Sequence, residues 1–231
     1  MKKELKSFST GTLKGLISQI PFAGSLVSGW DHYERESYER NIEIVLILLA
    51  ERVENLEVFF NNEIFKTEEG KKIARKIFYL GTQIEFEDKQ KLFVNALVNC
   101  AEEQGDSFDI EKSKFIDILK NLSYSSLLIL AEIHPLFIHA VRREDKESDP
   151  LVAFPLVDEE QIIEKISEKF HPYIISSSLK EMEGQGLFSK IGAWQKQSDG
   201  KYYKIGGFAN ELAYTDFAAK FVEFITIKSD T

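Results

Sequence analysis

The sequence predicts a mainly α-helical protein with two parts: an N-terminal helical bundle with one very long helix, and a C-terminal winged-helix-like α+β domain with a short β-hairpin. Apolar residues recur at helical spacing through most of the chain. Beyond residue 150 the helices shorten, and two β-like runs follow, joined by a segment containing Asp199-Gly200, a favoured hairpin turn. We therefore expect a helical domain at 1–122 and a winged-helix-like domain at 123–231.

The helical domain opens on an apolar, Gly-rich segment at about 10–30. Its Gly15–Trp30 stretch, GLISQIPFAGSLVSGW, has no charged residue, although 29% of the chain is charged. Small residues let helices pack closely in lipid, whereas a helix on a soluble surface carries charges on its outer face. The segment is therefore either a permanent core hairpin around Pro21 or a membrane-insertion and oligomerisation element, with the residues Leu16, Ile17, Ile20, Phe22, Gly24, Leu26, Val27 and Trp30.

The long helix is predicted from Leu26 to Ile64. Apolar residues keep helical spacing across this stretch, which has no proline after Pro21 and no glycine after Gly29. The predicted helix has about forty residues, which exceeds the usual helix length and indicates a coiled-coil-like or bundle role.

Capping residues mark the helices that follow. Thr67 is a good N-cap for a helix that Gly81 ends, and Asp109 suits the start of another helix. Ser123 caps an apolar helix that we expect to be bent or broken near Pro135.

The winged-helix prediction rests on element order. Helices predicted at 126–137, 158–170 and 172–188 precede β-like runs at 188–195 and 201–207. A last amphipathic helix, capped by Thr215, closes the chain.

The charge pattern disfavours DNA as a partner of this domain. The chain has a formal net charge of −9 and a pI near 5.1, so it repels phosphate backbones overall. The predicted recognition helix has no arginine, the residue type most used to read guanine. The possible nucleic-acid or partner contacts, which also suit a solvated hairpin, are Lys180, Lys190, Lys196, Lys201 and Lys204.

No catalytic or metal-binding motif is present in the sequence. The single cysteine, Cys100, allows no intramolecular disulfide, fits a reducing cytoplasm, and lies in an apolar helical pattern that predicts a buried thiol. His134 and His139 are five residues apart with a proline between them, which is not the spacing of a helical metal pair. We therefore predict no enzyme, no cofactor and no metal.

An N-terminal segment and two packing boxes carry a family resemblance. A G-L-x-x-x-I-P-x-x-G segment begins at Gly15, and two boxes cover 86–133. With them the chain resembles bacterial and prophage proteins of the abortive-infection alpha type. The matching box residues are Gln90, Leu97, Ala101, Phe115, Ile118, Leu119, Leu122 and Ser123. The resemblance implies a role in defence against phage by disabling the infected cell, and it implies no catalytic residue.

Two functions follow as hypotheses. In the first, a cytoplasmic protein senses infection through a phage protein, forms a homo-oligomer and perturbs inner-membrane lipid, for example as a pore, through the segment at 10–30. Several copies are needed because about sixteen helical residues reach only ~24 Å, short of a ~30 Å bilayer core. In the second, the protein is a non-catalytic regulator or adaptor that dimerises through its helical domain and contacts protein or DNA through the winged helix.

Overall fold

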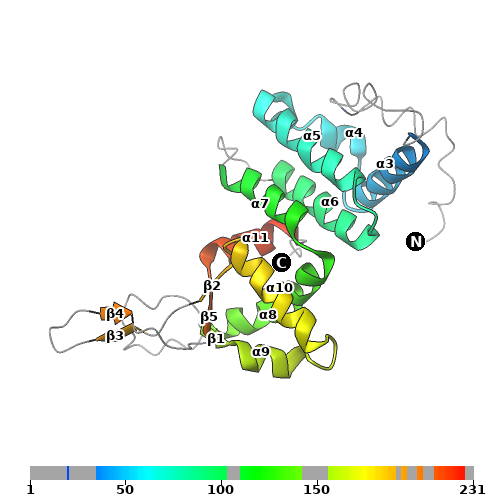
Figure 1. Cartoon of the computed structure of the whole chain (residues 1–231). Coiled ribbons are helices and arrows are strands. Elements are labelled where there is room, and N and C mark those ends of the chain that lie inside the picture. The colour runs from blue at the N-terminus through cyan, green and yellow to red at the C-terminus, as the bar shows by residue number, and fades with distance from the viewer. Residues whose placement is uncertain are drawn as a thin grey trace. The chain divides into compact units, whose positions relative to one another are not determined.

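The structure is a computed structural model that describes residues 20, 35–102, 110–141, 156–190, 194–196, 202–204 and 211–226 (Figure 1). The protein is mainly α-helical, as predicted, with nine α helices in these residues. It divides into two units. The first unit is Met1–Lys120 with Phe224–Thr231, and the second is Asn121–Glu223.

The first unit is built of helices around a buried central one, α6. Helices α3, α5 and α6 pack on one another, and the apolar side of α6 includes Phe93, Ala96, Leu97 and Cys100, all buried. In chain order the elements are α3 (Arg35–Ala50), α4 (Leu56–Phe60), the 3₁₀ helix η1 (Glu63–Lys66), α5 (Glu68–Thr82), α6 (Glu87–Glu102) and α7 (Ile110–Asn121).

The prediction of one helix from Leu26 to Ile64 is wrong within the described residues. Helix α3 ends at Ala50, and α4 begins only after Asn55. The Asn55 side chain accepts hydrogen bonds from the backbone N–H groups of Glu57 and Val58, at 2.8 and 3.1 Å. Asparagine competes with helix continuation in this way, and a new helix starts after it.

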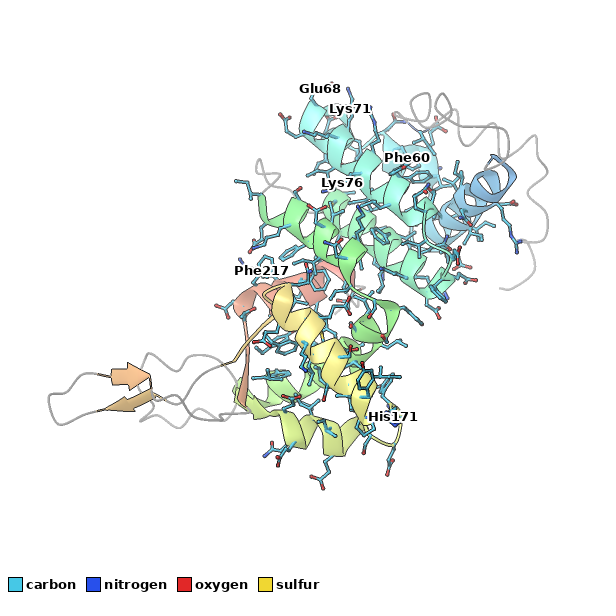
Figure 2. All side chains as sticks on the ribbon, in the orientation of Figure 1. Phe60, Glu68, Lys71, Lys76, His171 and Phe217 are labelled. Atoms are coloured by element: carbon cyan, nitrogen blue, oxygen red, sulfur yellow. The ribbon has the colours of Figure 1, made fainter. Side chains whose placement is uncertain are left out.

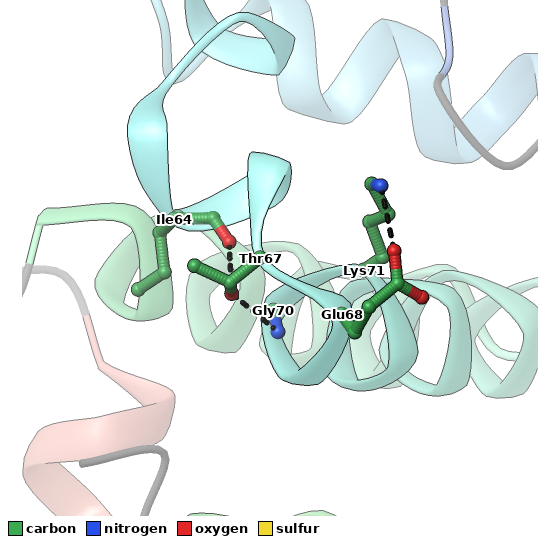
Figure 3. Close-up of polar contacts among 5 residues, drawn as sticks. All are labelled: Ile64, Thr67, Glu68, Gly70 and Lys71. Atoms are coloured by element: carbon green, nitrogen blue, oxygen red, sulfur yellow. Dashed lines mark hydrogen bonds and ion pairs between the residues drawn. The ribbon is translucent and has the colours of Figure 1, made fainter. Parts of the chain in front are cut away.

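The start of α5 is capped as predicted (Figure 3). The Thr67 hydroxyl accepts a hydrogen bond from the Gly70 N–H at 3.0 Å and donates one to the Ile64 carbonyl at 2.9 Å. A Cβ atom on Gly70 would lie 1.8 Å from that carbonyl oxygen, so η1 and α5 approach too closely for any larger residue. The Lys71–Glu68 ion pair, at 2.9 Å, closes the first turn.

Two buried amides on α6 bind the end of the last helix, α11 (Asp216–Ile225). The Asn95 Nδ2 group donates to the Ile225 carbonyl at 3.0 Å. The Asn99 Nδ2 group donates to the carbonyls of Phe224 and Thr226, at 2.9 and 2.8 Å. These bonds satisfy carbonyls that a helix C-terminus leaves without intrahelical donors, and they hold the C-terminal end of α11 in the first unit.

The second unit combines helices with two small antiparallel sheets. One sheet has the strand order β1-β5-β2, and the other pairs β3 with β4. The elements are α8 (Tyr124–Val141), β1 (Leu156–Asp158), α9 (Glu159–Ile166), α10 (Pro172–Gly184), β2 (Phe188–Lys190), β3 (Trp194–Lys196), β4 (Tyr202–Lys204), β5 (Glu211–Tyr214) and the first part of α11.

The sheet differs in detail from the sequence prediction. The run predicted as one strand at 188–195 forms two strands, and the first of them pairs with β5 in the register Ser189↔Ala213. Strand β1, which pairs with the other edge of β5 in the register Val157↔Leu212, was not expected. Strands β3 and β4 pair in the register Gln195↔Tyr203, whereas the Asp199-Gly200 turn predicted between them lies outside the described residues.

Helix α8 begins where the sequence predicts but does not break at Pro135. The Ser126 N–H donates to the Ser123 hydroxyl at 3.2 Å, which confirms the cap. Helix α8 continues through Pro135 to Val141. The other predicted cap of this unit is also confirmed, since the Ala218 N–H donates to the Thr215 hydroxyl at 3.0 Å.

Candidate functional site

The candidate site is the exposed face of α10 and of the α9–α10 turn. His171, at the start of α10 (Figure 2), is the N-cap of that helix. Its Nδ1 accepts a hydrogen bond from the Tyr173 N–H at 3.2 Å, and Pro172 occupies the first helical position. Proline suits that position because its missing N–H would have no helical partner there. The first turn of α10 is therefore ordered by local chemistry.

One face of α10 is buried and the other is exposed. Ile175, Leu179 and Met182 pack into the second unit, as their three- and four-residue spacing predicts. On the other face, Tyr173 is 77% exposed and Ile174 is 41% exposed. Because Tyr173 and Ile174 are consecutive, their exposed side chains form a small contiguous apolar surface on the first turn of α10.

A carboxylate holds α10 against the start of α8. Glu181 accepts hydrogen bonds from the Ser123 N–H at 2.8 Å and the Ser123 hydroxyl at 2.7 Å, and also from the Ser126 hydroxyl. Ser126 is fully buried. A carboxylate near a helix N-terminus is favoured by the helix dipole and by the free N–H groups there, so Glu181 fixes the position of α10.

The turn between α9 and α10 is held by an ion pair and α10 is ended by a glycine turn. Lys169 pairs with Glu132 of α8 at 2.7 Å. Beyond α10, Gly186 has a φ of 78°, a conformation that favours glycine. The Leu187 N–H donates to the Met182 carbonyl at 3.0 Å, which closes the helix end before β2.

A histidine and a tyrosine form another polar contact inside this unit. His134 Nδ1 and the Tyr214 hydroxyl are 2.6 Å apart. Burial lowers the pKa of His134, although Glu223 opposes that shift, and burial with the Glu223 charge raises the pKa of Tyr214 above its usual range. Both shifts favour the uncharged forms of the two side chains. Phe137 stacks on the Tyr214 ring at 4.8 Å, so the pair is embedded in the core and positions β5 on α8.

The structure brings together few of the residues singled out from the sequence. Lys180 is exposed on α10. Lys190, Lys196 and Lys204 lie in strands β2, β3 and β4, and their side chains and the whole of Lys201 lie outside the described residues. Of the membrane-insertion residues, Ile20 is buried, at 3% exposed; outside the described residues lie Leu16, Ile17, Phe22, Gly24, Leu26, Val27 and Trp30.

The described part of the chain contains no group of three or more His, Cys, Asp or Glu side chains placed to hold a metal ion. The thiol of Cys100 is buried, as predicted. A hollow of about 500 Å³ opens on the first unit, and it is lined by Glu57, Val58, Asn61, Asn62 and Glu63. Among the described helices, none is long and apolar enough to cross a membrane.

Sequence reasoning missed two sets of long-range polar contacts. In the second unit, Glu181 of α10 caps the start of α8. In the first unit, Asn95 and Asn99 bind the end of α11. The sequence offered one sign of the Asn95 and Asn99 contacts: both amides occupy positions on the buried face of a helix, and a buried amide needs a hydrogen-bond partner.

Comparison with known proteins gives no match: no family model, no curated protein and no solved structure matches the chain.

Proposed function

We propose that the second unit is a winged helix that contacts protein, and that the whole protein is a non-catalytic regulator or adaptor. The observation that carries the proposal is the order of the elements with the sheet they build. In chain order the elements are α8, β1, α9, α10, β2 and, after β3 and β4, β5. In the sheet, β5 lies between β1 and β2. A winged helix has this order: a helix, a strand, two helices, and two strands that extend into a wing.

The charge on α10 supports protein rather than DNA as the partner. In DNA-binding members of this fold class the second helix of the helix-turn-helix enters the major groove, with Arg and Lys reading bases and phosphates. Here Lys180 is the one cation of α10, and Glu181 and Glu183 follow it. Acidic residues also outnumber basic ones over 121–223, so the unit repels a phosphate backbone.

The exposed apolar residues of α10 support the same partner. Tyr173 and Ile174 are not among the buried core residues of the second unit, and interfaces between proteins are enriched in aromatic side chains such as Tyr173. A fold by itself assigns no function, so the choice of protein rather than DNA as the partner rests on the residues that this face presents.

The membrane effector of phage defence stays a prediction. Its insertion residues, apart from Ile20, lie outside the described residues. The burial of Ile20 suits both a sheltered segment and a permanent core hairpin.

The first test is a titration of the full-length protein into labelled duplex DNA at low and at physiological salt. We expect no saturable binding at physiological salt. Tight, salt-sensitive binding that Lys180→Glu abolishes would overturn the proposal, because it would show phosphate contact by α10.

The second test looks for the protein partner directly. A photo-crosslinking phenylalanine analogue replaces Tyr173 in the full chain, and a matched variant carries it at the exposed Lys72 of α5. We expect a discrete protein adduct in cells from position 173 and none from position 72. Equal labelling from both positions would show that α10 has no specific protein partner.

A further inference from the structure

We propose that the partner presents a cationic, amphipathic segment, rich in Lys or Arg with a few apolar side chains, and that this segment docks on the exposed face of α9 and α10. This inference rests on the proposed function, because it names the chemistry of the protein partner. It is argued from three features of the second unit: an exposed apolar pair, a rigid support beneath it, and a line of carboxylates beside it.

The apolar pair provides the anchor. Tyr173 and Ile174 are exposed on the first turn of α10, next to the turn that follows α9. Removing a large aromatic and a branched aliphatic from water together is favourable in proportion to the apolar area covered. Tyrosine also keeps a hydroxyl that a polar rim can satisfy, which makes it a frequent anchor at protein interfaces.

The support under the anchor is rigid. The His171 cap and Pro172 order the first turn, and Glu181 ties the far end of α10 to α8. The Lys169–Glu132 ion pair holds the preceding turn on α8. Because the residues that carry the anchor are already ordered, a partner loses little further conformational entropy in binding there.

The carboxylates define the charge of the partner. Glu160 and Glu164 are four residues apart on the exposed face of α9, and Glu168 continues the line in the turn, also exposed. Ile162 and Ile166 form the opposite, buried face. Among the described residues, Glu164 and Glu168 form no ion pair.

The lysines near Glu160, Glu164 and Glu168 do not cancel the net negative charge of these carboxylates. Lys165 is the one cation on α9, and Lys169 is already paired with Glu132. A Lys- or Arg-rich segment therefore meets net negative charge beside an apolar anchor.

Charge and symmetry exclude the other occupants of this face. Nucleic acid and anionic lipid would place phosphates against Glu164 and Glu168 and would be repelled. A second copy in a two-fold contact through this face would put the same net negative charge on both sides of the interface. A cationic protein segment gains from both the apolar pair and the carboxylates, which is the complementarity that sets specificity and association rate.

The experiment uses the full-length protein and a labelled synthetic peptide of alternating Leu and Lys blocks that forms an amphipathic helix, with Glu replacing Lys in its control. We expect saturable binding of the Lys peptide, weakened by added salt, and little binding of the Glu peptide. The double variant Glu164→Lys/Glu168→Lys should weaken binding of the Lys peptide about tenfold. Tyr173→Ser should weaken it by a similar, about tenfold, factor without changing the thermal melting curve.

A matched charge reversal in the first unit separates this face from general attraction to an acidic protein. Glu51→Lys/Glu69→Lys changes the net charge equally at two exposed positions, and we expect it to change peptide affinity less than about twofold. Equal weakening by the two double variants, or no binding of the Lys peptide, overturns the inference. The proposed function fails separately, if the wild-type protein binds the DNA duplex tightly.

Discussion

The two amides of α6 make the sharpest test of how the first unit is held together, because similar substitutions should have different costs. Asn99 is 3% exposed and donates to two carbonyls of the C-terminal end of α11, at Phe224 and Thr226. Asn95 is 7% exposed and donates only to the Ile225 carbonyl, while its own Oδ1 is buried without a hydrogen-bond partner among the described residues.

The cost of each truncation follows from these partners. Asn99→Ala leaves the buried Phe224 carbonyl and the partly buried Thr226 carbonyl without this donor, so we expect it to lower the free energy of unfolding by about 2–3 kcal/mol. Asn95→Ala leaves the Ile225 carbonyl without this donor, but it also removes the buried Asn95 Oδ1, which has no hydrogen-bond partner among the described residues. The two terms oppose each other, and we expect a loss of less than about 1 kcal/mol.

The assay is urea unfolding of the full chain followed by circular dichroism, with hydrogen exchange of the amides at 220–226 as a local readout. Asn99→Ala should speed that exchange more than Asn95→Ala does, since it releases more of the helix end. Asn99→Asp keeps the shape but replaces the donor with an acceptor, so it should cost at least as much as Asn99→Ala. An Asn95→Ala loss equal to or larger than the Asn99→Ala loss would refute the reasoning.

Three further predictions concern the fold of each unit. Gly70→Ala should lower the free energy of unfolding by at least ~2 kcal/mol, because the added Cβ meets a backbone carbonyl. Gly184→Ala should stabilise the protein slightly, because the space around its Cβ is open. Equal melting temperatures of the two variants would contradict this prediction. Burial lowers the pKa of His134, so at pH values below 6.5, the usual pKa, the unfolded chain binds more protons than the folded protein. The free energy of unfolding should therefore fall as the pH drops below that value. Tyr214→Phe should lower the free energy of unfolding by about 1 kcal/mol at neutral pH, because the hydrogen bond to His134 is lost. A flat pH profile in urea, unchanged by His134→Gln, would count against it. Glu181→Gln should destabilise the second unit by about 1–2 kcal/mol, since an amide accepts at one oxygen where the carboxylate uses two; an unchanged melting curve would show that the carboxylate adds nothing.

Local chemistry made several parts of the fold predictable. The caps at Thr67, Ser123 and Thr215 are confirmed, because a side-chain oxygen and an N–H three residues later make a helix start without help from the rest of the chain. The burial of Cys100 follows from the apolar period of its helix.

Where two local signals compete, the sequence pattern misled. Apolar spacing continues through Asn55, yet its side chain binds the following N–H groups and the helix stops. Pro135 predicts a bend or a break, and α8 continues through it without breaking. Periodicity reports which face is buried, and it does not report whether one helix or two carry that face.

Of the candidate site, the sequence predicted helices that correspond to α9 and α10, and the structure places Lys180 at an exposed position of α10. The winged-helix assignment and the contact role of Lys180 stay predictions. The sequence did not predict the exposed Tyr173 and Ile174, because an apolar residue on a short helix is normally assigned to the core. Their exposure is decided by which side of α10 packs on α8.

By itself the sequence determined the helical class, the capped helix starts and the acidic balance of the chain, since each depends on neighbouring residues or on composition alone. Only the tertiary structure decided the partners of distant groups. Strands β1 and β5 have three and four residues and exist through pairing across more than fifty positions. The amides Asn95 and Asn99 reach carbonyls about 130 positions away. Contacts of this range are selected by the packing of whole elements, which no local pattern encodes.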